Sequence, residues 1–213
     1  MDKIKLTANQ KSYLRNKAIA GAKLYKNYLI NKDFWIICED GSDYKFQFKK
    51  KDFKHLTGIK SDLNDSRFFQ NCTEALLSDN NIADIQHYNY QTLKAKADRI
   101  SKINSIICES IEESLFMVNL HTNTDDYPVA IKNAITNTCI GFKGPDNYAR
   151  TLRKASNSNN SDEEKKIVAI FSKMKESLEY NNIEYISDKD RIFELKCDIE
   201  EISAELWKDL NNQ

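Results

Sequence analysis

The residues with the most scope for chemistry are three histidines, and one of them lies in a strongly basic segment. His55 sits between Lys45 and Lys60, where six lysines stand against one aspartate. A neutral imidazole can take up or donate a proton near pH 7, and neighbouring lysines lower its pKa and attract anions. We therefore single out His55 as a candidate acid or base, beside the competing interpretation that it is a structural histidine.

The other histidines and the five cysteines give weaker signals. We expect His87 in a connection between helices and His121 at the end of a strand, both as surface or capping residues. The cysteines form no CxxC pair and no Cys/His spacing typical of a metal site, so we expect reduced structural thiols. There is also no glycine-rich phosphate loop and no HExxH motif. The sequence predicts neither a metal nor a cofactor.

Charge is distributed unevenly along the chain, although 32 basic and 32 acidic side chains cancel. A second basic segment, residues 142–156, contains four cations against Asp146. Residues 188–209 hold eight carboxylates against four bases. These segments are either ordinary solvated faces or a localised anion or nucleic-acid site with an acidic tail elsewhere.

The elements that must position these side chains switch between helical and strand periodicity. Thr7 is a typical cap for a helix over 8–30, whose apolar residues keep helical spacing. An Asp40-Gly41 turn between two β-rich stretches, 33–38 and 44–48, predicts a hairpin. Further along we expect helices over 66–77, 90–111 and 188–210, strands over 115–120 and 138–142, and a strand or short helix over 129–134.

Residues 165–180 fit two structures. Their apolar spacing slightly favours a helix, with Ser161 and Glu164 as a capping box. The run from Ile167 to Phe171 is equally typical of a buried strand, with a second strand near Tyr185.

Length and composition bound the class of protein. The 213 residues suit one domain, or one domain with an appended element. Aromatic residues at 10% argue against disorder. The apolar runs are too short for a membrane helix, and the N-terminus lacks a signal-peptide core, so we expect a cytoplasmic protein.

One stretch resembles a known family. Residues 44–59, YKFQFKKKDFKHLTGI, are similar to the opening signature of a phage and mobile-element family, in which an F-x-F-K strand runs into N/D-F-x-H-L-x-G. It is the fourth of the phage families grouped with Barnase, EndoU, colicin and RelE-type nucleases. The order of later elements is similar over roughly residues 30–187, through Arg99 and Ile140-Gly141-Phe142 to Tyr148–Leu152. Ala149 stands where the family has a proline.

The resemblance implies metal-independent cleavage of RNA, in which the 2′-hydroxyl attacks its own phosphorus. That reaction needs a base, an acid and cations around the phosphoryl oxygens. His55 is the implied acid or base and Thr151 a hydroxyl donor. The alternatives for the phosphate clamp are Arg150, Arg153, Lys143 and Arg99, and we place Arg150 with His55 and Thr151. The residues implied to bind RNA are Lys49, Lys54, Arg99, Lys143, Tyr148 and Arg153, with Tyr148 as a stacking or phenolic group.

For the fold we expect α+β: an N-terminal helix, a mainly antiparallel sheet covered on one face by helices, and a C-terminal amphipathic helix. The domain would span 1–187, and the acidic helix 188–213. The family's strand pair favours strands over 165–187.

Two functions remain open from the sequence. One is a phage or mobile-element endoribonuclease, of the kind that serves as a toxin or effector. The other is an inactive binding protein on the same scaffold, such as an inhibitor of a host defence complex, so the expected partner is RNA or a host defence protein in the host cytoplasm. The nuclease hypothesis requires His55, Arg150 and Thr151 to line one cleft.

Overall fold

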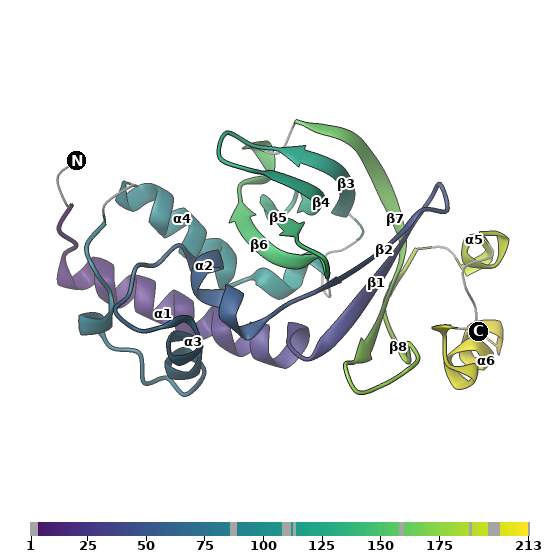
Figure 1. Cartoon of the computed structure of the whole chain (residues 1–213), viewed down its shortest axis with the longest axis horizontal. Helices are drawn as coiled ribbons and strands as arrows, with labels where there is room; N and C mark the ends of the chain where they lie inside the picture. The colour runs from purple at the N-terminus through teal and green to yellow at the C-terminus, as the bar shows by residue number, and fades with distance from the viewer. Residues whose placement is uncertain are drawn as a thin grey trace.

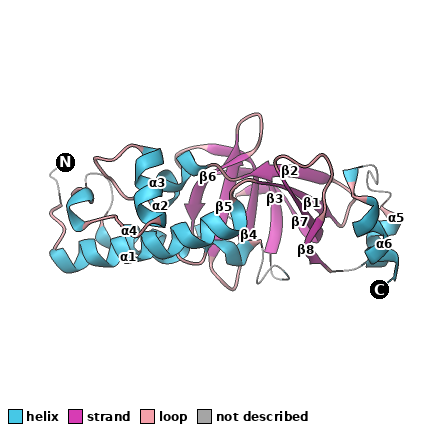
Figure 2. Cartoon of the chain, turned by 90° about the horizontal axis from the view of Figure 1, so that it is seen from below, coloured by secondary structure: helices cyan, strands magenta, loops and turns pink. Residues whose placement is uncertain are grey.

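The computed structural model describes residues 4–85, 89–107, 112, 114–157, 160–187, 189–195 and 201–212. The chain is α+β and elongated, with helices at one end, a sheet in the middle and two more helices at the other end (Figures 1 and 2). The α-helices are α1 (Ala8–Leu24), α2 (Phe53–Thr57), α3 (Asp65–Thr73), α4 (Tyr90–Ile100), α5 (Lys189–Glu194) and α6 (Ala204–Asn212). His87, Cys108 and Cys197 lie outside the described residues.

The strands form a sheet that closes on itself. They are β1 (Lys32–Cys38), β2 (Asp43–Gln47), β3 (Ser114–His121), β4 (Asp126–Asn133), β5 (Thr138–Lys143), β6 (Tyr148–Arg153), β7 (Ser161–Met174) and β8 (Asn182–Ile186). Their order is β1-β2-β6-β5-β4-β3-β7-β8, and an additional β1–β7 pairing completes a ring from which β8 extends. The expected α+β class and mainly antiparallel pairing are confirmed, but the expectation of a simple open sheet was wrong.

Two features close the ring. The fourteen-residue strand β7 pairs with β3 through its first half and with β1 through its second half. At the opposite side, β2 meets β6 in a short parallel contact, Gln47 beside Tyr148, which the Asn147 amide extends by donating to the Lys45 carbonyl at 3.0 Å. Closure leaves these edges paired, which an open sheet cannot achieve.

The N-terminal helix matches its predicted start. Thr7 and Gln10 form a reciprocal capping box. The α-helix ends at Leu24, and one wider π-helical turn (Tyr25–Leu29) carries the chain to β1. At Gly21 a Cβ would lie 2.6 Å from the Ile100 carbonyl oxygen, so glycine permits the close approach of α1 to α4.

One predicted helix is shorter than expected. The helix expected over 90–111 ends at Ile100, and a 3₁₀ helix (Ile103–Ile106) follows. The hydroxyls of Ser101 and Ser105 donate to carbonyls three residues back, which is local bonding that competes with a continuing helix. Residues 108–111 lie outside the described part of the chain.

The C-terminal helix expected over 188–210 is divided into α5 and α6. Between them Ile202 pairs with Tyr180 as an isolated bridge, so the backbone there bonds to another segment instead of continuing a helix. Both pieces still turn apolar residues toward one surface. Ile192, Ile202 and Leu206 share a buried cluster with Trp35 and Phe171 on the outer face of β1 and β7.

The first ten residues of the ambiguous stretch 165–180 are strand, because β7 continues to Met174, and β8 pairs back on it as the second strand. The predicted hairpin is also confirmed, with Phe34 paired to Phe46. Inside the ring these aromatic residues join the core formed by α1 to α4. No helix in the described ranges is both long and apolar enough to cross a membrane.

Candidate active site

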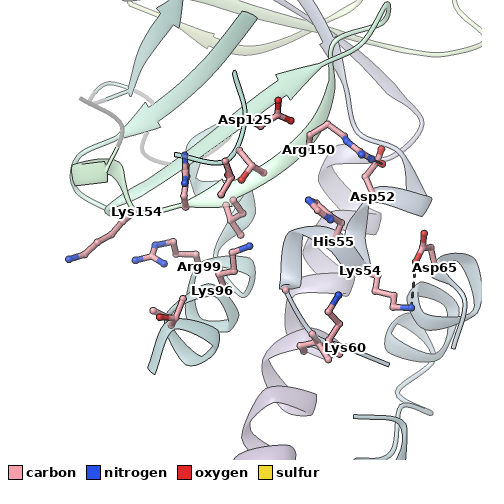
Figure 3. A pocket seen from close by; sticks show the side chains of 18 of the residues that line it. Asp52, Lys54, His55, Lys60, Asp65, Lys96, Arg99, Asp125, Arg150 and Lys154 are labelled. Atoms are coloured by element: carbon pink, nitrogen blue, oxygen red, sulfur yellow. Dashed lines mark hydrogen bonds and ion pairs between the residues drawn. The ribbon is translucent and has the colours of Figure 1, made fainter. Parts of the chain in front are cut away.

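A cleft of about 1240 Å³ opens where α2, α4 and β6 meet. Figure 3 shows its lining side chains. Eight of the lining residues are lysine or arginine: Lys51, Lys54, Lys60, Lys96, Arg99, Arg150, Arg153 and Lys154. Three are aspartates, and each of these is ion-paired to a lysine or arginine. The cleft therefore carries an excess of positive charge, which suits a polyanionic ligand.

His55 lies in the short helix α2 that follows the basic strand β2. Phe53 and Leu56 on either side of it are buried, which fixes the helix and leaves His55 exposed at the cleft. Its ring nitrogens make no hydrogen bond with any residue that the structure describes. Desolvation by the cleft walls, together with the charges of Lys96 and Arg150, lowers the pKa of His55, so its imidazole is neutral near pH 7.

Gly58 fixes the position of this helix relative to α4. It ends α2 in the left-handed region with φ of 70°, and its amide donates to the His55 carbonyl at 3.1 Å. A Cβ at Gly58 would lie 2.9 Å from Cδ of Lys96. The glycine of the H-L-x-G motif thus ends the helix and lets the stem of Lys96 cross it.

A register shift brings Arg150 and Thr151 to the cleft together. On β6, Thr151 pairs with Gly141 and Ala149 with Phe142, so Arg150 is skipped in the register. Such a bulge redirects side chains, and here two successive polar residues line the same cleft. Gly141 leaves room for the methyl group of Thr151, which a Cβ there would meet at 2.8 Å. The Thr151 hydroxyl has no hydrogen-bond partner among the described residues.

Asp52 is a lining residue that the sequence did not single out. It is 2% exposed, and its Oδ1 accepts from Nη1 of Arg150 at 3.3 Å, while its buried Oδ2 has no partner in the described structure. Burial raises the pKa of Asp52 although Arg150 opposes the shift. A single aspartate in a lysine-rich segment gives no sequence signal for burial, because its burial depends on β6 passing beside α2.

The other predicted RNA-binding residues fall into two groups. Lys54, Arg99 and Arg153 line the cleft. Lys54 also donates to the Leu63 carbonyl and lies 3.6 Å from Asp65, so it braces the following loop (Figure 3).

Lys49, Lys143 and Tyr148 do not line the cleft. Lys49 pairs with Asp146 at 2.9 Å, and Lys143 pairs with Asp125 at the cleft rim. The ring of Tyr148 lies under cations, with the Lys49 ammonium 4.5 Å and the Arg150 guanidinium carbon 5.5 Å from its centre. Tyr148 therefore supports Arg150 from outside the cleft.

The arrangement has the parts for acid–base work on a phosphate. A neutral imidazole, a guanidinium held by a buried carboxylate and an available hydroxyl converge from segments about a hundred residues apart. Three or more His, Cys, Asp or Glu side chains nowhere gather into a possible metal site within the described ranges.

The comparisons with known proteins give one match. The family model described as "phage-Barnase-EndoU-ColicinE5/D-RelE like nuclease4" matches residues 19–189. No curated protein and no solved structure matches the chain.

Proposed function

Because the chain belongs to the phage-Barnase-EndoU-ColicinE5/D-RelE like nuclease family 4, we propose that it is an endoribonuclease that cleaves RNA through the 2′-hydroxyl without a metal. The family supports a phage-associated nuclease. The RNA substrate, the absence of a metal and the residue roles are our proposal. The alternative of an inactive binding protein receives no support from these comparisons.

In the proposed reaction neutral His55 takes the proton of the 2′-hydroxyl as that oxygen attacks phosphorus. The bond between phosphorus and the 5′-oxygen breaks, water in the open cleft protonates the leaving 5′-oxygen, and a 2′,3′-cyclic phosphate remains. Its lowered pKa keeps the base form populated at neutral pH. Arg150 donates to the phosphoryl oxygens, where charge builds up in the transition state, and Thr151 adds a hydroxyl donor. Lys54, Arg99 and Arg153 hold the RNA strand, and Lys49, Lys143 and Tyr148 act at the rim.

The observation that supports this most is convergence. The nuclease hypothesis requires His55, Arg150 and Thr151 to line one cleft, and all three do so. A packing role for His55 does not explain why its side chain is exposed at a cleft lined by Lys60, Lys96 and Arg150.

The test uses substrates that isolate the 2′-hydroxyl. Purified protein is incubated in EDTA with total tRNA, with ribosomal RNA and with an oligonucleotide pair that differs only by one 2′-deoxy position at the mapped cleavage site. We expect RNA cleavage that leaves 2′,3′-cyclic phosphate ends and no cleavage at the deoxy position. Cleavage that needs added metal, or that continues at the deoxy position, contradicts the mechanism. If the folded protein cleaves none of these RNAs, the result contradicts the proposal that the chain is an endoribonuclease.

A further inference from the structure

The cations of the cleft lie in two groups. Figure 3 shows Arg150 beside His55 and Asp52 on one side, and Lys96, Arg99 and Lys154 on the other. One scissile phosphate can be held by the first group. The volume of about 1240 Å³ exceeds that of a typical small-molecule pocket, so the cleft has room for more of a strand than its reacting phosphate.

The second group comes from two elements. Lys96 and Arg99 are three residues apart on α4, which places them on one helix face. Arg153 ends β6, and Lys154 follows it. Contact between α4 and β6 brings these four cations to one wall of the cleft.

The two arginines of this group have donors that can bind an anion. Arg99 donates from Nε to the Asn137 carbonyl at 3.1 Å, which anchors the side chain and leaves its terminal nitrogens without a partner among the described residues. In the described structure, Nη1 of Arg153 is buried and has no hydrogen-bond partner. A buried donor without an acceptor is costly, and a phosphate oxygen would satisfy it.

Electrostatics point the same way. Burial, followed by the charges of Arg153 and Arg99, lowers the pKa of Lys96. The three cations thus repel one another. The three aspartates of the lining pair with Lys54, Lys143 and Arg150, which lie outside the second group. Repulsion of this kind is relieved when an anion binds between the cations.

We propose that Lys96, Arg99, Arg153 and Lys154 form a second phosphate subsite, which binds a non-scissile phosphate of the same RNA strand. The inference rests on the proposed function for its substrate, and it adds a size requirement. The preferred substrate is a polynucleotide that spans both groups of cations, whereas a dinucleotide fills only the site at His55.

The experiment measures binding without cleavage. His55→Ala protein is titrated by fluorescence anisotropy with end-labelled oligoribonucleotides of two, four and eight residues over a range of KCl concentrations. The titrations are repeated in the His55→Ala background with Arg99→Gln and Arg153→Gln together. The matched control is Lys173→Gln with Lys175→Gln, which removes two cations outside the cleft. Circular dichroism and thermal melting confirm that each variant is folded.

We expect affinity to rise from the dinucleotide to the octanucleotide, and the double arginine variant to bind the octanucleotide about tenfold or more weakly. The slope of log affinity against log salt should fall by about 0.7 for each phosphate that the variant no longer neutralises. The Lys173/Lys175 control should keep the full gain with length. Equal weakening in both double variants, or an unchanged gain with length in the arginine variant, overturns the subsite.

Two further arms separate the possible failures. Inorganic phosphate is titrated as a competitor. If phosphate displaces the octanucleotide at phosphate concentrations near the Kd of the octanucleotide, the wall binds free phosphate, and the strand subsite is overturned. Cleavage by the wild-type chain is scored separately. RNA binding that depends on Arg99 and Arg153 without any cleavage rejects the enzyme and keeps the subsite. Cleavage by the wild-type chain, together with unaltered RNA binding in the arginine variant, keeps the enzyme and rejects the subsite.

Discussion

His55 and His121 are the same residue type in opposite surroundings. His55 is exposed in the cleft among lysines and arginines, and its pKa is lowered. His121 ends β3 between Asp126 at 3.1 Å and Asp162 at 3.3 Å, and hydrogen bonds to both carboxylates raise its pKa. Carboxylates of the same chain balance the charge of protonated His121, whereas the ring of His55 is left available for a ligand.

The same contrast extends to the neighbouring polar groups. At the end of β3, Asn119 donates to Asp162 at 2.8 Å. In the cleft, Oδ2 of Asp52 and Nη1 of Arg153 are buried and lack partners in the described structure. Unsatisfied groups cost stability, and two of the three such atoms in the described part of the chain line this cleft, which marks it as a site for binding or chemistry.

The largest expected effect comes from replacing the two histidines in turn. His55→Ala should reduce RNA cleavage by about 10²–10⁴-fold, the usual contribution of a general acid or base. His121→Ala should leave cleavage unchanged, because His121 does not line the cleft. The measurement is kcat/KM on one fluorogenic RNA, with thermal melting of both variants. Equal activity losses in two folded variants would remove the distinction between the two regions.

Asp52→Asn should produce the next largest effect. The change keeps the shape and weakens the hold on Arg150, and a misplaced clamp can cost up to about a hundredfold in rate. The loss should appear in kcat more than in KM if Asp52 positions Arg150 for the transition state. The matched control is Asp162→Asn, which removes a carboxylate from His121. Cleavage as fast as that of wild type would leave Asp52 without a role in positioning.

Asp52→Asn should also change how the free energy of unfolding depends on pH. Burial raises the pKa of Asp52 in the folded chain, so ionised Asp52 opposes folding at neutral pH. Its contribution to stability is fully favourable below the ordinary aspartate pKa of about 3.9 and is lost as pH rises through the raised value. Asp52→Asn should therefore match or exceed the wild-type free energy of unfolding at pH 7, and the difference should vanish near pH 3. Urea unfolding at both pH values measures it.

Local parts of the fold were predictable, and long-range parts were not. The hairpin was predictable because alternating residues and the Asp40-Gly41 turn specify it within sixteen residues. Ring closure was not, since it depends on β7 pairing with both β3 and β1, which lie far from it in the sequence. His55 had a local signal in its basic segment. The choice of Arg150 depended on the family resemblance, because a register shift on β6 has no mark in the sequence.

Gly58→Ala compares two glycines in the left-handed region. Gly58 has φ of 70° and Gly41 has φ of 83°, so alanine at either should cost about 1–2 kcal/mol of stability. Only at Gly58 does the new methyl group meet the stem of Lys96, at 2.9 Å; at Gly41 it meets Leu195 at 3.4 Å. Gly58→Ala should therefore destabilise more than Gly41→Ala and also reduce cleavage. Urea unfolding and kcat/KM test both, and a larger activity loss in Gly41→Ala would contradict the link to the cleft.

The smallest effect is the separation of two titration midpoints. In imidazole NMR spectra His55 should titrate below the ordinary value of about 6.5 and His121 above it, with assignments from His→Gln variants. Neutral His55 contributes its full stabilisation above pH 6.5, and this contribution is lost as pH falls through its lowered pKa. Protonated His121 contributes its full stabilisation below pH 6.5, and this contribution is lost as pH rises through its raised pKa. Lys96→Gln should raise the midpoint of His55 and leave that of His121 in place, and Asp126→Asn should lower only the midpoint of His121. If the His55 midpoint does not respond to Lys96→Gln, the charge of Lys96 does not govern its protonation, and if the midpoint lies above 6.5, neither burial nor the cations of the cleft lower it. In either case kcat/KM should fall with acid at the midpoint that is measured.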